Sequence, residues 1–170
     1  MTEINSQGSQ SHLTEERIRK GFELLFFAYR DFISDSDAIL SKYNFGRAHH
    51  RVIYFVSRHP NINVSELLSI LQITKQSLSR VLSQLIEQGF ILQTPGAVDR
   101  RQRLLELSTK GVELEAKLWE MTSSRFKKAY ESCGLDSVRG FECVLHGMIN
   151  EDIPEPVRVM VDRKVEPVDA

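Results

Sequence analysis

The sequence predicts a mainly α-helical protein with a small β-hairpin wing: a winged helix-turn-helix with helices on both sides of it. Two apolar helical patterns, in residues 63–71 and 74–88, are separated by only a short turn at Gln72-Ile73. Two strand-like segments follow, around a loop that contains several arginines. Further helical patterns precede and follow this central unit. Two helices joined by so short a turn must cross sharply, as in a helix-turn-helix, and the basic hairpin supplies the wing.

The second helix of the pair has the strongest pattern. Its apolar residues recur at helical spacing and form one stripe: Leu78, Val81, Leu82, Leu85 and Ile86. Thr74 is a favourable N-cap residue, and Gly89 suits a left-handed residue just past the helix end. The opposite face is cationic or short and polar, with no acid until Glu87. It consists of Lys75, Gln76, Ser77, Ser79, Arg80, Ser83 and Gln84.

The first helix of the pair and the hairpin complete the unit. Asn63 and Glu66 have capping-box spacing, and the buried stripe is Val64, Leu67, Leu68 and Leu71. After Gly89 the helical period is lost, and residues 90–94 and 103–108 resemble strands around a loop at residues 95–102.

Four segments together resemble the MarR family of bacterial transcription regulators. They are residues 73–82, Gly89-Phe90-Ile91, Asp99-Arg100-Arg101 and Leu107-Ser108-Thr109-Lys110-Gly111. The resemblance covers roughly residues 14–150, and the wing signature is its most specific part. It implies a homodimeric DNA-binding regulator of a kind that often responds to a small ligand.

Composition is that of a globular protein. The chain has 170 residues, enough for one domain with its own core. It is 41% hydrophobic and 26% charged, values typical of soluble proteins. No apolar run approaches the roughly 20 residues that span a membrane, and Met1–Ser11 lacks the features of a secretory signal. We therefore expect a cytoplasmic protein with no membrane partner.

Charge is distributed unevenly along the chain. The net charge of −1 alone would argue against a nucleic-acid partner. From Thr74 to Arg103, however, five basic residues stand against two acids, whereas residues 151–170 carry six acids and three bases. A dimer would double the basic patch on one surface, so the overall balance does not count against DNA binding.

The predicted organisation is one intertwined domain with five parts. Residues 1–12 are expected to be disordered, 13–45 to form an N-terminal dimerisation helix and 46–108 the winged helix-turn-helix. Residues 109–150 would form C-terminal dimerisation helices, and 151–170 an acidic, irregular tail in which Val157, Val159 and Val161 alternate like a strand. The dimerisation roles come from the resemblance. From the residues alone, the broad apolar surface of the first helix, which bends around residues 34–37, fits a thick core as well as a dimer interface.

The candidate DNA-reading residues lie at the start of the second helix. The N-terminal part of a recognition helix meets base edges in the major groove. Gln76, Ser77 and Arg80 are predicted to face the groove, and Thr74, Lys75 and Ser79 mainly the phosphates. The alternative is an ordinary solvated polar face.

The wing supplies the remaining candidates. The resemblance places the wing-tip arginine at Arg101, held by an ion pair with Asp99, and an arginine there suits the narrow minor groove. Arg100 and Arg103 would add phosphate contacts. Alternatively, Asp99 is simply a turn-forming residue.

No cofactor or metal is expected. His49, His50, His59 and His146 lack the spacing of a structural zinc motif. Cys133 and Cys143 are predicted to be reduced and packed. No catalytic motif is present, so an enzyme is not expected.

The predicted function is a sequence-specific DNA-binding regulator, a homodimeric repressor that reads a pseudo-palindromic operator. Relief by a small ligand is a further hypothesis, based on aromatic and adaptable residues near the junction of the dimer and DNA-binding parts: Phe22, Phe26, Tyr29, Phe55, Trp119 and Met121. These residues fit a plain core as well. The alternative function is a winged-helix protein-interaction module without specific DNA binding.

Overall fold

The computed structural model describes residues 13–97 and 99–163. The expected disordered segment, residues 1–12, lies outside the described residues. The described elements are, in chain order, α1 (Glu15–Ser34), α2 (Asp37–Ser41), α3 (Arg47–Arg58), β1 (Ile62–Asn63), α4 (Val64–Leu71), α5 (Lys75–Glu87), β2 (Ile91–Pro95), β3 (Arg103–Leu107), α6 (Thr109–Cys133), α7 (Leu135–Met148) and α8 (Glu155–Val161). The predicted fold class, mainly helical with a small β wing, is confirmed.

Side-chain caps start four of the helices, and those of α4 and α5 are the two predicted above. The hydroxyls of Thr14, Thr74 and Ser108 accept hydrogen bonds from the first turns of α1, α5 and α6. Asn63 and Glu66 form the predicted capping box of α4: Asn63 Oδ1 accepts from the Glu66 backbone N–H at 3.0 Å, and Glu66 Oε2 accepts from the Asn63 N–H at 3.0 Å. These bonds satisfy backbone donors that a helix start leaves without partners.

The sheet has three antiparallel strands in the order β1-β3-β2. The predicted hairpin is β2 and β3, in which Ile91 pairs with Leu107 and Pro95 with Arg103. The strand β1 was not predicted, and its Ile62 pairs with Leu105 of β3. Two residues are too few to show an alternating pattern, so only the fold reveals this strand.

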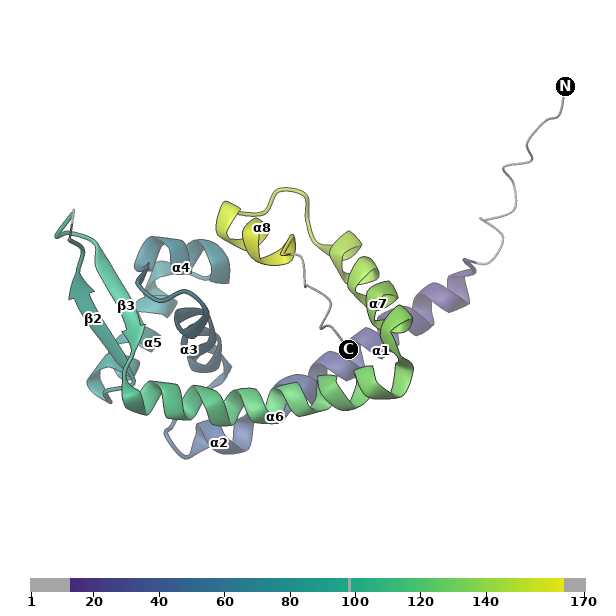
Figure 1. The fold of residues 1–170 in the computed structure, drawn as a ribbon, viewed down its shortest axis with the longest axis horizontal. Helices are drawn as coiled ribbons and strands as arrows, with labels where there is room; N and C mark the ends of the chain where they lie inside the picture. The colour runs from purple at the N-terminus through teal and green to yellow at the C-terminus, as the bar shows by residue number, and fades with distance from the viewer. Residues whose placement is uncertain (1–12, 98, 164–170) are drawn as a thin grey trace, which may run out of the picture.

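One hydrophobic core joins the helix-turn-helix, the sheet and the first half of α6. Its largest fully buried side chains come from every one of these elements and from α2 and α3: Leu40, Val52, Ile53, Val56, Leu67, Leu78, Leu85, Phe90, Ile91, Leu105, Leu114 and Leu118. Figure 1 shows α6 running from this lobe toward α1 and α7 at the far end of the molecule. The long helix thus connects the lobe to the terminal helices.

The predicted N-terminal helix, residues 13–45, is divided into α1 and α2 near the predicted bend. Between α1 and α2, the Asp35 carboxylate accepts two hydrogen bonds from the Arg125 guanidinium of α6, from Nε at 2.7 Å and from Nη2 at 2.7 Å. This hydrogen-bonded guanidinium lowers the pKa of the Asp35 carboxyl. Arg125 therefore fastens α6 to the end of α1.

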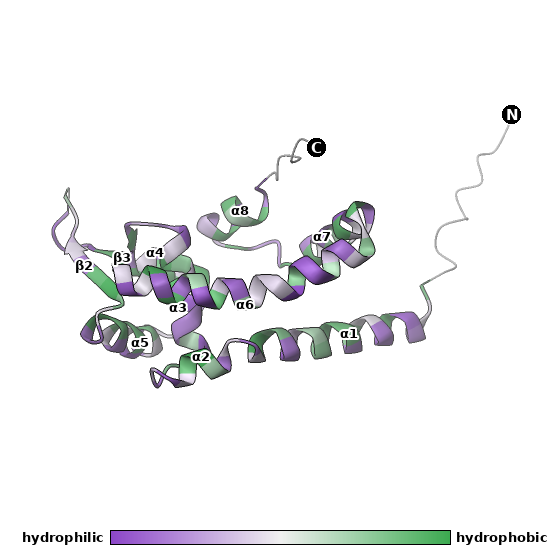
Figure 2. Cartoon of the chain, turned by 60° about the horizontal axis from the view of Figure 1, so that its bottom comes forward, coloured by the Kyte–Doolittle hydropathy of each residue, from purple (hydrophilic) through white to green (hydrophobic). Residues whose placement is uncertain are grey.

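Much of the apolar surface of the terminal helices is exposed in the single chain. α1 has no buried residue, and Phe22 is 71% exposed. Hydrophobic positions occur along its length in Figure 2. The sequence pattern predicts that Val138, Phe141, Leu145, Met148 and Ile149 face inward. In the structure Phe141, Met148 and Ile149 are exposed, and Val138 is the one buried residue of α7. That prediction is wrong for the single chain, because no element within residues 13–97 and 99–163 covers this side of α7. Among the described residues, no helix is long and apolar enough to cross a membrane.

The acidic tail is neither irregular nor a strand over residues 155–161, because it forms α8. Pro154 precedes the helix and Pro156 lies in its first turn, where proline's fixed φ suits a helix start. Two side-chain contacts hold α8 in place. Met160 Sδ lies 3.0 Å from His59 Nε2 near α4, and Asp162 Oδ1 lies 3.1 Å from His146 Nε2 of α7. Such contacts between distant residues leave no trace in a local pattern. Residues 164–170 of the tail lie outside the described part.

Gly111 should tolerate no larger side chain. An added Cβ would collide with the carbonyl oxygen of Phe90, so Gly111→Ala should reduce the free energy of unfolding by about 1–3 kcal/mol, measured by urea denaturation. Gly140→Ala in α7 is the matched control, because nothing within 4 Å would meet its Cβ in this chain. Equal stability of Gly111→Ala and the parent chain would contradict the packing described.

Candidate nucleic-acid interface

The helix α5 follows α4 after a sharp turn and presents its polar face outward. Gln72 adopts the left-handed conformation, with φ of +52°, and ends α4. Four residues of the predicted apolar stripe are buried: Leu78, Val81, Leu82 and Leu85. Lys75, Gln76, Ser79 and Arg80 are exposed. The predicted division of α5 into core and solvent faces is therefore confirmed except at Gln84, which is half-buried.

Two hydroxyl groups at the start of α5 bond to each other. Thr74 Oγ1 accepts from the Ser77 backbone N–H at 3.2 Å and donates to Ser77 Oγ at 2.8 Å. The Thr74 hydroxyl is thus already engaged as the helix cap. The first turn of α5 contains no acidic residue, so the end of the helix dipole that attracts anions stays open to a phosphate.

The tip of the wing is closed by Asp99, but not in the predicted way. Asp99 Oδ1 accepts a hydrogen bond from the backbone N–H of Arg101 at 2.9 Å. Among the described residues, Asp99 forms no ion pair with the Arg101 guanidinium. An aspartate commonly bonds to the backbone two residues ahead in a turn. The contact therefore shapes the loop and leaves the Arg101 guanidinium without this carboxylate as a partner.

Five cations on α5 and the wing remain exposed: Lys75, Arg80, Arg100, Arg101 and Arg103. No carboxylate in the described ranges lies within ion-pair distance of any of them. The Arg103 guanidinium donates a 3.3 Å hydrogen bond to the Arg100 carbonyl oxygen, a contact that leaves its charge in place. The surface thus offers positive charge to an anionic partner.

A compact junction connects the end of α5 to the start of α6. It consists of Gly89, Phe90, Ser108, Lys110 and Gly111. Ser108 Oγ donates to the Gly89 carbonyl oxygen at 2.6 Å and accepts from the Gly111 N–H at 3.1 Å. Lys110 Nζ donates to the Gln88 carbonyl oxygen at 2.8 Å and lies 4.1 Å from the Phe90 ring centroid. This junction explains physically why these residue types stand in two of the segments that carry the family resemblance.

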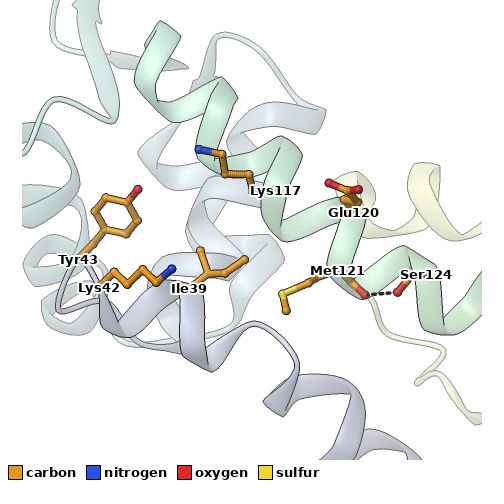
Figure 3. A pocket seen from close by; sticks show the side chains of 7 residues that line it. All are labelled: Ile39, Lys42, Tyr43, Lys117, Glu120, Met121 and Ser124. Carbon is orange, nitrogen blue, oxygen red and sulfur yellow. Dashed lines mark hydrogen bonds between the residues drawn. The ribbon is translucent and has the colours of Figure 1, made fainter.

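A cavity of about 590 Å³ opens between α2 and α6, away from the basic face. It is lined by Ile39, Lys42, Tyr43, Lys117, Glu120, Met121 and Ser124 (Figure 3). Of the residues predicted for an effector site, only Met121 is among them. Phe22, Phe26 and Tyr29 are exposed on α1, and Trp119 packs against Tyr54 with ring centroids 6.0 Å apart. The lining comes from two helices distant in sequence, which composition alone could not bring together.

The described histidines and cysteines do not gather into a metal site. In the described part of the chain, no group of three or more His, Cys, Asp or Glu residues could hold a metal ion. Burial lowers the pKa of His50, because it disfavours the charged imidazole. Cys133 and Cys143 are free and exposed, so the prediction that they pack is wrong. They lie on α6 and α7, the helices whose apolar sides are incompletely covered within one chain.

Comparison with known proteins agrees with this geometry. A sequence profile of the MarR family matches residues 43–102. The HTH-type transcriptional regulator PetP of Rhodobacter capsulatus is 41% identical over 164 residues, covering 95% of this chain and 99% of PetP. The crystal structure of Streptococcus pneumoniae FabT in complex with DNA has a TM-score of 0.67 at 17% identity, covering 79% of this chain and 94% of FabT.

A second solved structure shows the same fold. A mutant MarR from E. coli complexed with operator DNA has a TM-score of 0.62 at 21% identity, covering 82% of this chain and all of that one. At such identities the two structures establish the fold, while the PetP match over nearly the whole length establishes the family. The chain belongs to the MarR family and is a winged helix-turn-helix transcriptional regulator.

Proposed function

We propose that this protein is a homodimeric repressor that binds a pseudo-palindromic operator sequence-specifically. The observation that carries the proposal is the set of five exposed cations on α5 and the wing, none of which is in an ion pair with a described carboxylate. Backbone phosphates supply much of the affinity in protein–DNA complexes. FabT and MarR, which share this fold, have been crystallised with DNA.

Different side chains of α5 would contact the bases and the phosphates. Gln76 can pair bidentately with adenine, Arg80 with guanine, and Ser77 with either a base or a phosphate. Thr74, Lys75 and Ser79 would mainly contact phosphates at the helix start. In the wing, Arg101 would enter the minor groove, while Arg100 and Arg103 would contact the backbone.

The exposed apolar sides of α1 and α7 support the homodimer. Apolar surface of this extent on a single chain marks an interaction site. A second copy would cover it and place two α5 helices on one face, about 34–36 Å apart for half-sites one helical turn apart. The tail has no assigned part in DNA binding.

The DNA proposal is tested by fluorescence anisotropy with a duplex that the protein enriches from a random pool, together with its scramble. Gln76→Ala should weaken the binding free energy by about 1–3 kcal/mol on the enriched duplex only, because contacts to bases determine sequence specificity. Arg101→Ala should weaken both duplexes and flatten the salt dependence by roughly one unit of slope. Lys127→Ala, an exposed cation on the distal half of α6, is the control.

Two results would contradict the DNA proposal. If Arg101→Ala left affinity and salt slope unchanged, the wing assignment would be wrong. Weak, salt-insensitive association with every duplex would favour the protein-interaction module instead.

The dimer is tested by sedimentation velocity. Phe22→Glu places a charge in the apolar stripe of α1 and should shift the protein toward monomer, because a buried charge at an interface is costly. Lys20→Glu is the control, because it introduces the same glutamate on the polar side of α1 and should leave the dimer intact. A parent chain that sediments as a monomer at micromolar concentration would overturn the proposal.

We also propose that the cavity between α2 and α6 receives a small anionic effector. Lys42 and Lys117 outnumber the one carboxylate, Glu120, in its lining and leave a net positive charge. The residues Met121 and Ile39 supply apolar contact. Titration with small aromatic acids should change the fluorescence of Trp119, two residues from Met121 on α6, and weaken operator binding. Absence of both responses would exclude these acids as effectors. A ligand acts only through its difference in affinity for the two states of the protein.

A further inference from the structure

His49 lies near the start of α3 with both ring nitrogens engaged. The side chain is 8% exposed, and its ring is stacked on Phe45 with centroids 4.6 Å apart and planes 9° apart. Its Nδ1 accepts a hydrogen bond from the backbone N–H of Gly46 at 3.1 Å. This bond caps the start of α3 and holds the ring in one orientation.

The bond at Nδ1 determines what the other nitrogen does. A neutral imidazole has one acceptor and one donor nitrogen. Because Nδ1 accepts, the proton is on Nε2, which donates to Oε1 of Gln84 at 2.7 Å. Gln84 belongs to α5 and is half-buried. By sequence pattern it stands on the polar face of α5, but in the structure it bonds to α3.

This contact differs in kind from the apolar contacts that hold residues 75–87 of α5. The buried side of the helix is apolar, and apolar contacts are non-directional. Within the described residues, the His49–Gln84 bond is the one side-chain hydrogen bond between residues 75–87 and another element. A hydrogen bond requires a defined direction. It can therefore set the rotation of α5 about its own axis, which apolar packing specifies less sharply.

We infer that His49 is a positioning residue for DNA reading, acting through Gln84. Residues three or four apart share a helix face, so Gln84 lies one turn beyond Arg80 and two turns beyond Ser77. Holding Gln84 against α3 therefore fixes the direction in which Arg80 and Ser77 face. The inference rests on the proposed reading of DNA by α5 and adds a determinant of specificity that contacts no DNA.

The test compares three single variants, and one double variant that combines two of them, on the enriched duplex and on its scramble. Gln84→Met removes the acceptor at similar volume, Gln84→Glu keeps an acceptor oxygen, and His49→Phe keeps an aromatic ring while removing both bonds. The readout is the ratio of the two affinities, each measured on one preparation. A variant with a smaller folded fraction, or with weaker electrostatic attraction to DNA in general, loses affinity for both duplexes equally. Such effects cancel in the ratio.

The inference predicts that Gln84→Met lowers this ratio by about tenfold, a change expected when one buried donor loses its partner. Gln84→Glu should keep the ratio within about twofold of the parent chain, since a carboxylate also accepts from Nε2. His49→Phe combined with Gln84→Met should lower the ratio no further than Gln84→Met alone, because the bond from His49 to Gln84 is already lost in Gln84→Met.

Other results would overturn the inference. An unchanged ratio in Gln84→Met, or a ratio in Gln84→Glu as low as in Gln84→Met, would show that this bond does not position α5. If His49→Phe fails to fold, the two Gln84 variants still decide the question. If the parent chain enriches no duplex, the proposed DNA reading fails instead, and that outcome is seen before any variant is measured.

Discussion

The close approach of α6 to Phe90, the residue just before β2, is the constraint on which the rest of the structure depends. Gly111 lies so near the carbonyl oxygen of Phe90 that a Cβ would not fit. Around this contact, Ser108 and Lys110 bond to carbonyl oxygens at the end of α5. The recognition helix, the wing and the long helix therefore meet at one rigid point. None of the three can move there without disturbing the other two, because close-packed interiors transmit strain.

This constraint gives the terminal helices a physical route to the proposed DNA-reading surface. α6 extends from the junction to the region of α1 and α7, where the Asp35–Arg125 ion pair fastens it to the end of α1. The cavity of Figure 3 opens on the same helix, between these two attachments. A change in how two chains pack, or in what the cavity holds, would act on α6 and through it on α5. The bond from His49 to Gln84 supplies a second attachment of α5, independent of α6.

Local patterns predicted the parts of the fold that local chemistry determines. Thr74 and the Asn63–Glu66 box were readable from the sequence because a cap involves residues two or three positions apart. The buried stripe of α5 followed from its period. What could not be predicted depends on distant partners. The helix α8 is held by His59 and His146, and β1 exists only because β3 lies beside it. The inward face predicted for α7 is exposed because one chain does not cover it.

The candidate site was also predictable only in part: its exposed charges could be predicted, but the side-chain contacts of Asp99 and Gln84 could not. The sequence placed the cations of α5 and the wing on exposed elements, since charge and turn residues are visible in a single chain. The sequence left two interpretations of Asp99 open, the ion pair implied by the resemblance and a turn-forming residue, and the bond to the Arg101 backbone N–H supports the second. It gave no sign that Gln84 turns inward, because its partner His49 is 35 positions away.

The most direct test of the account is hydrogen exchange on the protein with and without its enriched duplex. Sequence-specific reading by α5 and the wing predicts slower exchange at residues 74–80 and 99–103 in the complex, with little change on the scrambled duplex at the same salt concentration. Protection confined to other segments, or equal protection by both duplexes, would contradict the claim that this surface reads DNA sequence.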